Sequence, residues 1–411
     1  MRRACLLPNR VLPLLAAISL LFIARASGQT DQTLYSFTGG ADGDNPLSNL
    51  ILDKAGNLYG TTFIGGAYGN GEVFELERNA SGEWTEKVLY SFTGGLDGSI
   101  PSYGGVISDA LGNLYGTTTD GGASNLGTVF ELTPNGAAWS EKVLYSFAGG
   151  KDGLNPYAGL TLDTAGNLYG TTYGGGPYGN GTAFELAPLA GGQWKETTIH
   201  SFNLTNGDAP AGGVVLDGQG NLYGVTQGGG SFKGGTAYEL MRSSSGKWTE
   251  KLLHSFGNGS DGTGPYVEQL VFDEQGNLYG TTLGGGSHQG GTVFKLSPSI
   301  SGAWKEGVLY SFDPTIESNP FSGLIFDRKG NLYGTCANGN GETTVGAVFE
   351  LTPGAGTWNA HDLFLFSRLN GEFPEASLVM DASGNLYGTT ELGGVYGQGV
   401  VFELVHSSPQ N

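Results

Sequence analysis

Acidic or amide residues occupy one position in six of seven sequence repeats, directly before a glycine and four residues ahead of a recurring proline. They are Asp42, Asp97, Asp152, Asn206, Asp261 and Asn370, and Ile316 is the exception. Carboxylates gathered in a ring would attract a divalent cation such as calcium, so the four aspartates are candidate metal ligands. The alternative, which we favour, is structural, because Asp-Gly and Asn-Gly pairs form turns.

A second repeated position carries an aromatic ring, three residues before the glycine that opens a strand-like segment. The rings are Tyr68, Tyr178, Phe232, His288 and Tyr396, whereas Ser124 and Thr343 stand in the other two repeats. Exposed rings near carboxylates suit the faces of sugars or other flat ligands, so these five residues are candidate ligand-binding residues. Alternatively each ring covers the neighbouring repeat, and we favour this second interpretation.

Positions that break the repeat are better guides to catalysis, because a catalytic group is needed only once. Glu268 and Gln269 stand where the other repeats mostly have Gly, Ser or Ala. Glu268 is therefore the one candidate catalytic residue, although a solvated carboxylate at a rim is the more common situation. The sequence contains no H-E-x-x-H motif, nucleophile elbow or Cys/His zinc spacing.

The elements that must position these residues follow from the pentapeptide Gly-Asn-Leu-Tyr-Gly, which occurs seven times. Its asparagines are Asn57, Asn113, Asn167, Asn221, Asn277, Asn331 and Asn385, spaced by 54 or 56 residues. Each period contains four strand-like runs, A to D in chain order, as in residues 50–52, 58–62, 73–76 and 84–92. Four short strands in about 55 residues are typical of one propeller blade.

The turn between runs A and B has the form Asp-x-x-Gly-Asn in every period, as in residues 53–57. This pattern predicts a type I turn closed by a glycine bulge, because Asp accepts backbone hydrogen bonds and Gly takes the left-handed conformation. With this strand order, the D-to-A and B-to-C loops share one rim of the ring. The A-to-B and C-to-D turns share the other rim.

The count of strands predicts how the ring closes. The first D run, residues 33–37, precedes every A-B-C triplet, and the last triplet has no D run after it. An open ring would leave two unpaired sheet edges, which propellers avoid. We therefore predict an all-β, seven-bladed β-propeller with four-stranded blades, closed by the N-terminal strand pairing with the last blade.

The N-terminus has early arginines, an apolar stretch and small residues before the cleavage site, a pattern that predicts a secretory signal peptide covering residues 1–28. Residues 29–411 then form the propeller, and we expect a secreted, periplasmic or cell-surface protein. Loss of four arginines and no acid would change the formal charge from −19 to −23. Such a surface disfavours nucleic acid. We expect a monomer without membrane insertion after signal removal, and Cys336 would be its single thiol.

The repeated pattern D-x-x-G-N-L-Y-G-T-T…G-G-G…F-E-L…P, seen in residues 163–188, resembles that of the choice-of-anchor GloVer-containing proteins, which are bacterial exported repeat proteins. The resemblance covers essentially the whole mature chain. It implies a surface or secreted protein with a C-terminal anchor and assigns no activity to particular residues. This chain departs from the pattern, because residues 405–411 carry no apolar tail. The turn also resembles, distantly, those of propeller lyases and NHL-type propellers.

These observations favour a non-catalytic binding or cell-surface interaction module that uses the rim of the D-A and B-C loops. Its ligand would be a glycan or a protein, and no cofactor is required. The alternative is a secreted propeller enzyme, either a lyase or a glycan-active protein. That enzyme would use Glu268 and a divalent cation at the channel mouth. Turnover or a metal requirement would distinguish the enzyme from the module.

Overall fold

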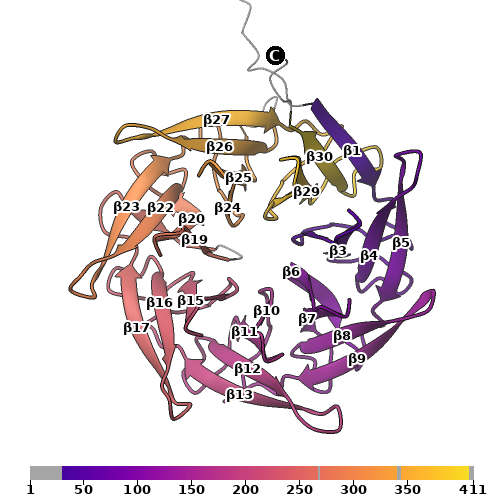
Figure 1. Ribbon diagram of the computed structural model, residues 1–411, viewed down its shortest axis with the longest axis horizontal. Coiled ribbons are helices and arrows are strands. Elements are labelled where there is room, and N and C mark those ends of the chain that lie inside the picture. Colours follow the sequence, from indigo (N-terminus) through magenta and orange to yellow (C-terminus); the bar gives the residue numbers. More distant parts are fainter. Residues whose placement is uncertain (1–29, 267–268, 340–343, 407–411) are drawn as a thin grey trace, which may run out of the picture.

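Seven four-stranded antiparallel sheets surround a central axis, so the predicted all-β, seven-bladed propeller is confirmed (Figure 1). The computed structural model describes residues 30–266, 269–339 and 344–406. The expected signal peptide, Glu268 and the last five residues therefore lie outside the described residues. In each blade the A strand is innermost and the D strand outermost.

The strands follow the same order in every blade, from A at the axis to D at the circumference. Blades 1 to 4 contain β2 (Ile51–Leu52), β3 (Leu58–Thr62), β4 (Glu72–Arg78), β5 (Trp84–Ser91); β6 (Ser99–Ser108), β7 (Leu114–Asp120), β8 (Thr128–Asn135), β9 (Ala138–Ser146); β10 (Thr161–Leu162), β11 (Leu168–Thr172), β12 (Thr182–Pro188), β13 (Trp194–Ser201); and β14 (Val215–Leu216), β15 (Leu222–Thr226), β16 (Thr236–Arg242), β17 (Trp248–Ser255).

Blades 5 to 7 complete the ring, and blade 5 has an additional short pair of strands in its loops. They contain β19 (Val271–Phe272), β20 (Leu278–Thr282), β22 (Thr292–Pro298), β23 (Trp304–Ser311), with β18 (Gly262–Thr263) and β21 (Gly284–Gly285); β24 (Ile325–Phe326), β25 (Leu332–Cys336), β26 (Ala347–Pro353), β27 (Trp358–Leu365); and β28 (Val379–Met380), β29 (Leu386–Thr390), β30 (Val400–Val405), β1 (Thr30–Ser36).

The ring is closed as predicted, with β1 antiparallel to β30. Thr33 lies opposite Phe402 and Ser36 opposite Val400 in this ladder. Blade 7 thus takes three strands from the C-terminal end and one from the N-terminal end of the propeller (Figure 1). Because the two ends are held in one sheet, no blade edge of the ring is left unpaired at the junction.

The A-B turn forms one repeated hydrogen-bond network, of which blade 1 is an example. Asp53 Oδ1 accepts from the backbone N–H of Ala55 at 2.8 Å and of Asn57 at 2.9 Å. Asp53 Oδ2 accepts from the Tyr59 hydroxyl at 3.3 Å, and the same hydroxyl donates to Glu75 Oε1 at 2.9 Å. The Asp53 carboxylate therefore stabilises the turn through hydrogen bonds, as the pattern predicts.

The last glycine of the pentapeptide is required by packing inside each blade. A Cβ on Gly60 would lie 2.7 Å from the ring of Phe74, which is fully buried on strand C. Phe74 in turn packs edge-on against Phe37 of the preceding blade, with ring centroids 5.2 Å apart. Both faces of each sheet are covered in this way, and the apolar core consists of seven clusters, one between each pair of adjacent blades.

No helix that is long and apolar enough to cross a membrane occurs within residues 30–406 as far as they are described.

Candidate functional site

The D-A and B-C loops share one rim, as predicted. Backbone bridges join the two loops of one blade, for example Asp44 to Ile64 in blade 1 and Glu372 to Leu392 in blade 7. The backbone N–H of Phe63 also donates to the carbonyl of Asn45 at 2.9 Å. The D-A/B-C rim is therefore a continuous surface built from both loops of all blades.

The four predicted metal-ligand aspartates lie on this rim, each inside its own D-A loop. Asp42 accepts hydrogen bonds from the Tyr35 hydroxyl and the Thr38 backbone N–H, both at 2.9 Å. Burial opposes ionisation, but these hydrogen bonds, including one from the Thr38 hydroxyl, hold the pKa of Asp42 below its ordinary value. The side chain of Asp42 thus closes a turn.

The other three aspartates have the same structural partners. Asp97 accepts from the Tyr90 hydroxyl at 3.0 Å. Asp152 accepts from the Tyr145 hydroxyl at 2.8 Å. Asp261 lies 3.0 Å from Nε2 of His254, the residue that replaces this tyrosine in blade 4. Among the described residues, no group of three or more His, Cys, Asp or Glu side chains could hold a metal ion.

The five predicted ligand-binding rings lie open on the outer part of the same rim. Tyr68, Tyr178, Phe232 and Tyr396 expose 50–64% of their surfaces, and His288 is exposed as well. A large part of each ring is therefore accessible to a ligand. The loop tip of Tyr68 is fastened outward, because the backbone N–H of Ala67 lies 3.3 Å from the hydroxyl of Ser91, on the outermost strand.

The outer rings are not brought together by the fold. Each belongs to a different blade, and none of the ring contacts between described residues joins two of them. They would contact a partner only as separate points around the circumference.

Gln269, the neighbour of the predicted catalytic residue Glu268, lines the central channel. Gln269 Nε2 donates to the Thr161 hydroxyl at 2.9 Å and to the Val214 carbonyl at 3.0 Å. These contacts join three consecutive blades, 3, 4 and 5, on one side of the channel. A cavity of about 310 Å³ lies among the A strands here, lined by Gln269, Asn49 and Ser377 among others.

Above this cavity, six aromatic side chains meet at the mouth of the channel on the D-A/B-C rim. We call them the axial aromatic cluster: Phe63, Tyr103, Tyr157, Tyr173, Tyr266 and Phe321. The rings of Tyr103 and Tyr266 are 6.2 Å apart although they come from blades 2 and 5, on opposite sides of the ring. Tyr103 also stacks on Tyr157 at 6.1 Å.

All six rings are partly exposed, so the axial aromatic cluster forms a surface at the axis. Tyr266 contacts Phe321 at 5.6 Å, and Tyr157 contacts Tyr173 at 5.1 Å. Aromatic rings that are held edge to face or stacked, with a face left open, form rigid and amphipathic binding surfaces.

Blade 7 contributes acids in place of rings, and we call Glu375 and Glu391 the axial acid pair. Glu375 follows Pro374 as Tyr157 follows Pro156 in blade 3. Glu391 takes the place of Tyr173, because the backbone N–H of Glu391 donates to Phe373 O at 3.0 Å just as that of Tyr173 donates to Asn155 O at 2.9 Å.

Both side chains of the axial acid pair are partly buried. Burial raises the pKa of Glu375 to about 7, and the charge of Glu391 adds to the shift. Burial also raises the pKa of Glu391, although a hydrogen bond from Asn45 to Glu391 Oε1, at 3.4 Å, opposes this shift. A bound cation or hydrogen-bond donor stabilises the charged form of two neighbouring carboxyls most strongly when those carboxyls are poorly solvated.

Sequence reasoning missed the axial aromatic cluster and the axial acid pair. The available signal was variation: the residue after the recurring proline is Leu47, Tyr157, Ala211, Tyr266, Phe321 or Glu375 in six of the blades. The residue after strand B varies in the same way, between Phe63, Tyr173 and Glu391 for example. The rings of the cluster and both acids come from these two positions, except Tyr103, which lies two residues after Pro101.

Exposed apolar side chains are concentrated on the same rim. The described residues include seventeen exposed large apolar side chains, of which eleven lie in D-A or B-C loops and three in the turns of the other rim. The eleven are Ile64, Tyr68, Leu96, Tyr173, Tyr178, Leu204, Phe232, Ile316, Leu369, Val395 and Tyr396. Such a concentration on one face of a protein is typical of an interaction surface.

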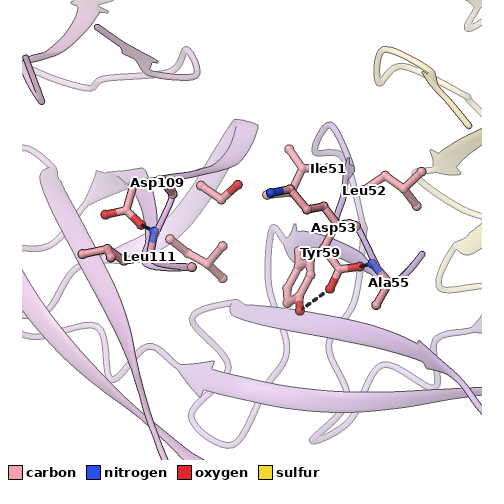
Figure 2. A pocket seen from close by; sticks show the side chains of 12 residues that line it. Ile51, Leu52, Asp53, Ala55, Tyr59, Asp109 and Leu111 are labelled. Atoms are coloured by element: carbon pink, nitrogen blue, oxygen red, sulfur yellow. Dashed lines mark hydrogen bonds between the residues drawn. The ribbon is translucent and has the colours of Figure 1, made fainter. Parts of the chain in front are cut away.

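The opposite rim has a pocket between the A-B turns of blades 1 and 2 (Figure 2). It encloses about 540 Å³ and is lined by Asp53, Tyr59, Asp109 and the exposed Leu111. Figure 2 shows Asp53 bound to Ala55 and Tyr59, and Asp109 bound to the Leu111 backbone N–H. The carboxylates of Asp53 and Asp109 and the Tyr59 hydroxyl are thus already used by the two turns.

We call the axial aromatic cluster and the axial acid pair together the axial site. The fold and the axial site define a closed tandem-repeat propeller with one asymmetric face. The sequence model of the Gloeobacter/Verrucomicrobia repeat matches residues 20–164, 140–345 and 241–410. The chain therefore belongs to the Gloeobacter/Verrucomicrobia repeat family, which confirms the resemblance seen in its sequence. Among curated protein sequences, none matches this chain significantly.

Solved structures confirm the fold. A protein from Lactobacillus plantarum is 18% identical with a TM-score of 0.54, over 85% of this chain and 99% of that one. PorZ, a surface component of the type-IX secretion system of Porphyromonas gingivalis, is 14% identical with a TM-score of 0.53, over 90% and 47%. The extracellular domain of a hybrid two-component system from B. thetaiotaomicron is 12% identical with a TM-score of 0.58, over 93% and 40%.

Proposed function

We propose that this protein is an exported, non-catalytic binding module that holds its partner on the D-A/B-C rim, with the axial site at the centre of the contact. The observation that carries the proposal is the axial aromatic cluster, in which side chains from five blades meet at one partly exposed surface. A repeat fold needs no such convergence for stability, because each blade is already packed on its neighbours.

The exposed apolar residues around the axial site support the same face as the contact surface. Binding energy at interfaces comes mainly from a central group of aromatic anchors surrounded by less critical contacts. The axial rings have the position of such anchors, and the outer rings have the position of the surrounding contacts.

The test uses two probe sets, an array of oligosaccharides and an array of peptides, with three forms of the protein. We expect at least one probe to bind the unaltered protein and to be lost in Tyr266→Ala. The matched control is Leu111→Ser, which changes an exposed apolar residue on the opposite rim and should retain binding. Loss of binding in the control with retention in Tyr266→Ala would refute the proposal. Turnover of a bound probe would show that the protein is an enzyme and not a non-catalytic binding module.

A further inference from the structure

We propose, building on the function above, that the axial site receives a lysine or arginine side chain presented by a polypeptide partner. Five blades supply the rings and blade 7 supplies the axial acid pair, so the site has an aromatic side and an anionic side. The arrangement is asymmetric in a molecule whose backbone repeats seven times.

The first argument is the charge of the site. Within the described part of the chain, no lysine, arginine or histidine pairs with Glu375 or Glu391. The nearest cation in sequence, Arg368, is 80% exposed and lies 3.5 Å from Glu372 instead. A carboxyl that is desolvated without a counter-charge is stabilised when a partner brings one.

The second argument is the chemistry of the rings. Ammonium and guanidinium groups are attracted to the faces of Tyr and Phe, and guanidinium groups also stack on them. The rings of Tyr157, from blade 3, and Tyr266, from blade 5, leave part of their surface open. Tyr266 is close enough to Glu375 for the carboxylate charge to raise the pKa of its hydroxyl.

The third argument selects a polypeptide over a sugar. The loops around the axial site expose aliphatic side chains, with Leu96, Leu204, Ile316, Leu369 and Val395 58–84% exposed. Aliphatic side chains pair with the apolar residues of a protein, whereas sugars are bound chiefly by ring faces and hydrogen bonds. A formal charge of −19 on the whole chain also steers cationic partners towards it.

The test is a set of dodecapeptide pools that differ only at a central residue, which is Lys, Arg, Nε-acetyl-lysine or citrulline. The flanking positions are mixtures of apolar and polar residues, and binding is measured by fluorescence polarisation. We expect the Lys and Arg pools to bind about tenfold more tightly than the two neutral pools, as one desolvated charge pair allows. Chitotetraose and its deacetylated form are included as sugar probes.

Two further variants test whether the preference for the Lys and Arg pools depends on the axial acid pair. Glu375→Gln with Glu391→Gln keeps the shape of both side chains and should abolish the preference for charged pools. Glu77→Gln, an exposed glutamate on strand C, should leave the preference unchanged. Equal binding of charged and neutral pools, or a preference that survives the double substitution, overturns this inference.

Failure of the inference and failure of the proposed function give different results. If a neutral sugar binds and is lost in Tyr266→Ala, the rim is the binding face and only the cationic partner is wrong. If binding of every probe is insensitive to Tyr266→Ala but lost in Leu111→Ser, the proposed function itself is wrong.

Discussion

The two rims of the propeller are built from the same seven repeats and differ in what the repeats hold constant. On the A-B/C-D rim, the aspartate, asparagine and tyrosine of the turn make the same hydrogen bonds in blade after blade, from Asp53 to Asp381. On the D-A/B-C rim, the backbone bridges are constant but the side chains that point to the axis differ from blade to blade. Repeated side chains therefore stabilise the turns of this protein, and it is the variable side chains on a constant backbone to which we assign the proposed binding function.

The largest effect we expect comes from disrupting the closure of the ring, where β1 from the N-terminal end pairs with β30 from the C-terminal end. Deleting residues 29–38 removes β1 and leaves β30 as an open, apolar edge. The truncated protein should aggregate or lose most of its thermal stability, measured by light scattering and circular dichroism. Adding a synthetic peptide of residues 30–38 should restore the melting transition, and a truncated protein as soluble and stable as the original would contradict the closure.

The second prediction concerns a departure from the repeat that is buried and should not affect binding. Glu72 replaces the threonine that pairs with a second threonine hydroxyl in other blades, as Thr118 and Thr128 do at 2.8 Å. Its side chain is fully buried and neither oxygen has a partner among the described residues. Burial, with the charges of Glu86 and Asp42 adding to it, raises the pKa of Glu72 to about 9.

The folded protein therefore keeps a proton on Glu72 that the unfolded chain releases near its ordinary pKa. Stability should fall as pH rises from about 4.5 towards 9, by on the order of 3 kcal/mol at pH 7. Glu72→Thr should remove this loss, so that the variant is more stable at pH 8 and gains little at pH 4. Urea unfolding at the two pH values measures the difference, with Glu77→Thr as the exposed control.

Local features of the fold could be predicted from the sequence, whereas contacts across the axis could not. The period, the A-B turn and the unmatched first strand are local features, so the blade number and the closure through Thr33 and Phe402 could be predicted. The contact between Tyr103 and Tyr266 could not, because it joins side chains from opposite blades across the axis. No spacing within one repeat specifies such a contact. The exposure of Tyr68 was one of two alternatives that the sequence left open, since a glycine-rich loop does not reveal the direction of its tip.

The third prediction concerns a substitution that weakens an A-B turn on the A-B/C-D rim. Asp163→Ala removes an acceptor of the Ala165 backbone N–H at 2.8 Å, the Asn167 side chain at 2.8 Å and the Tyr169 hydroxyl at 3.1 Å. Loss of these bonds should cost about 2 kcal/mol of unfolding free energy. Affinity for the best-binding peptide pool should not change. A variant that keeps its stability but loses peptide binding would reverse the roles that we assign to the two rims.

The smallest effects should come from the outer rings. Tyr178→Ala with Phe232→Ala removes exposed rings from adjacent blades and should reduce affinity by about 1 kcal/mol for each ring that touches the partner. Stability should be unchanged, because both side chains are at least half exposed. Isothermal titration compares this variant with Tyr266→Ala, and a larger loss for the outer pair would move the binding site from the axis to the circumference.

Hydrogen–deuterium exchange of the full chain, with and without the Lys pool at saturating concentration, tests most directly whether the D-A/B-C rim is the binding face. The predicted result is slowed exchange in the D-A loops, above all residues 257–266 and 367–376, which lead to Tyr266 and Glu375. Residues 53–57 and 109–113, the A-B turns beside the pocket of Figure 2, should exchange at the same rate in both samples. Protection of these turns without protection of the D-A loops would contradict the assignment.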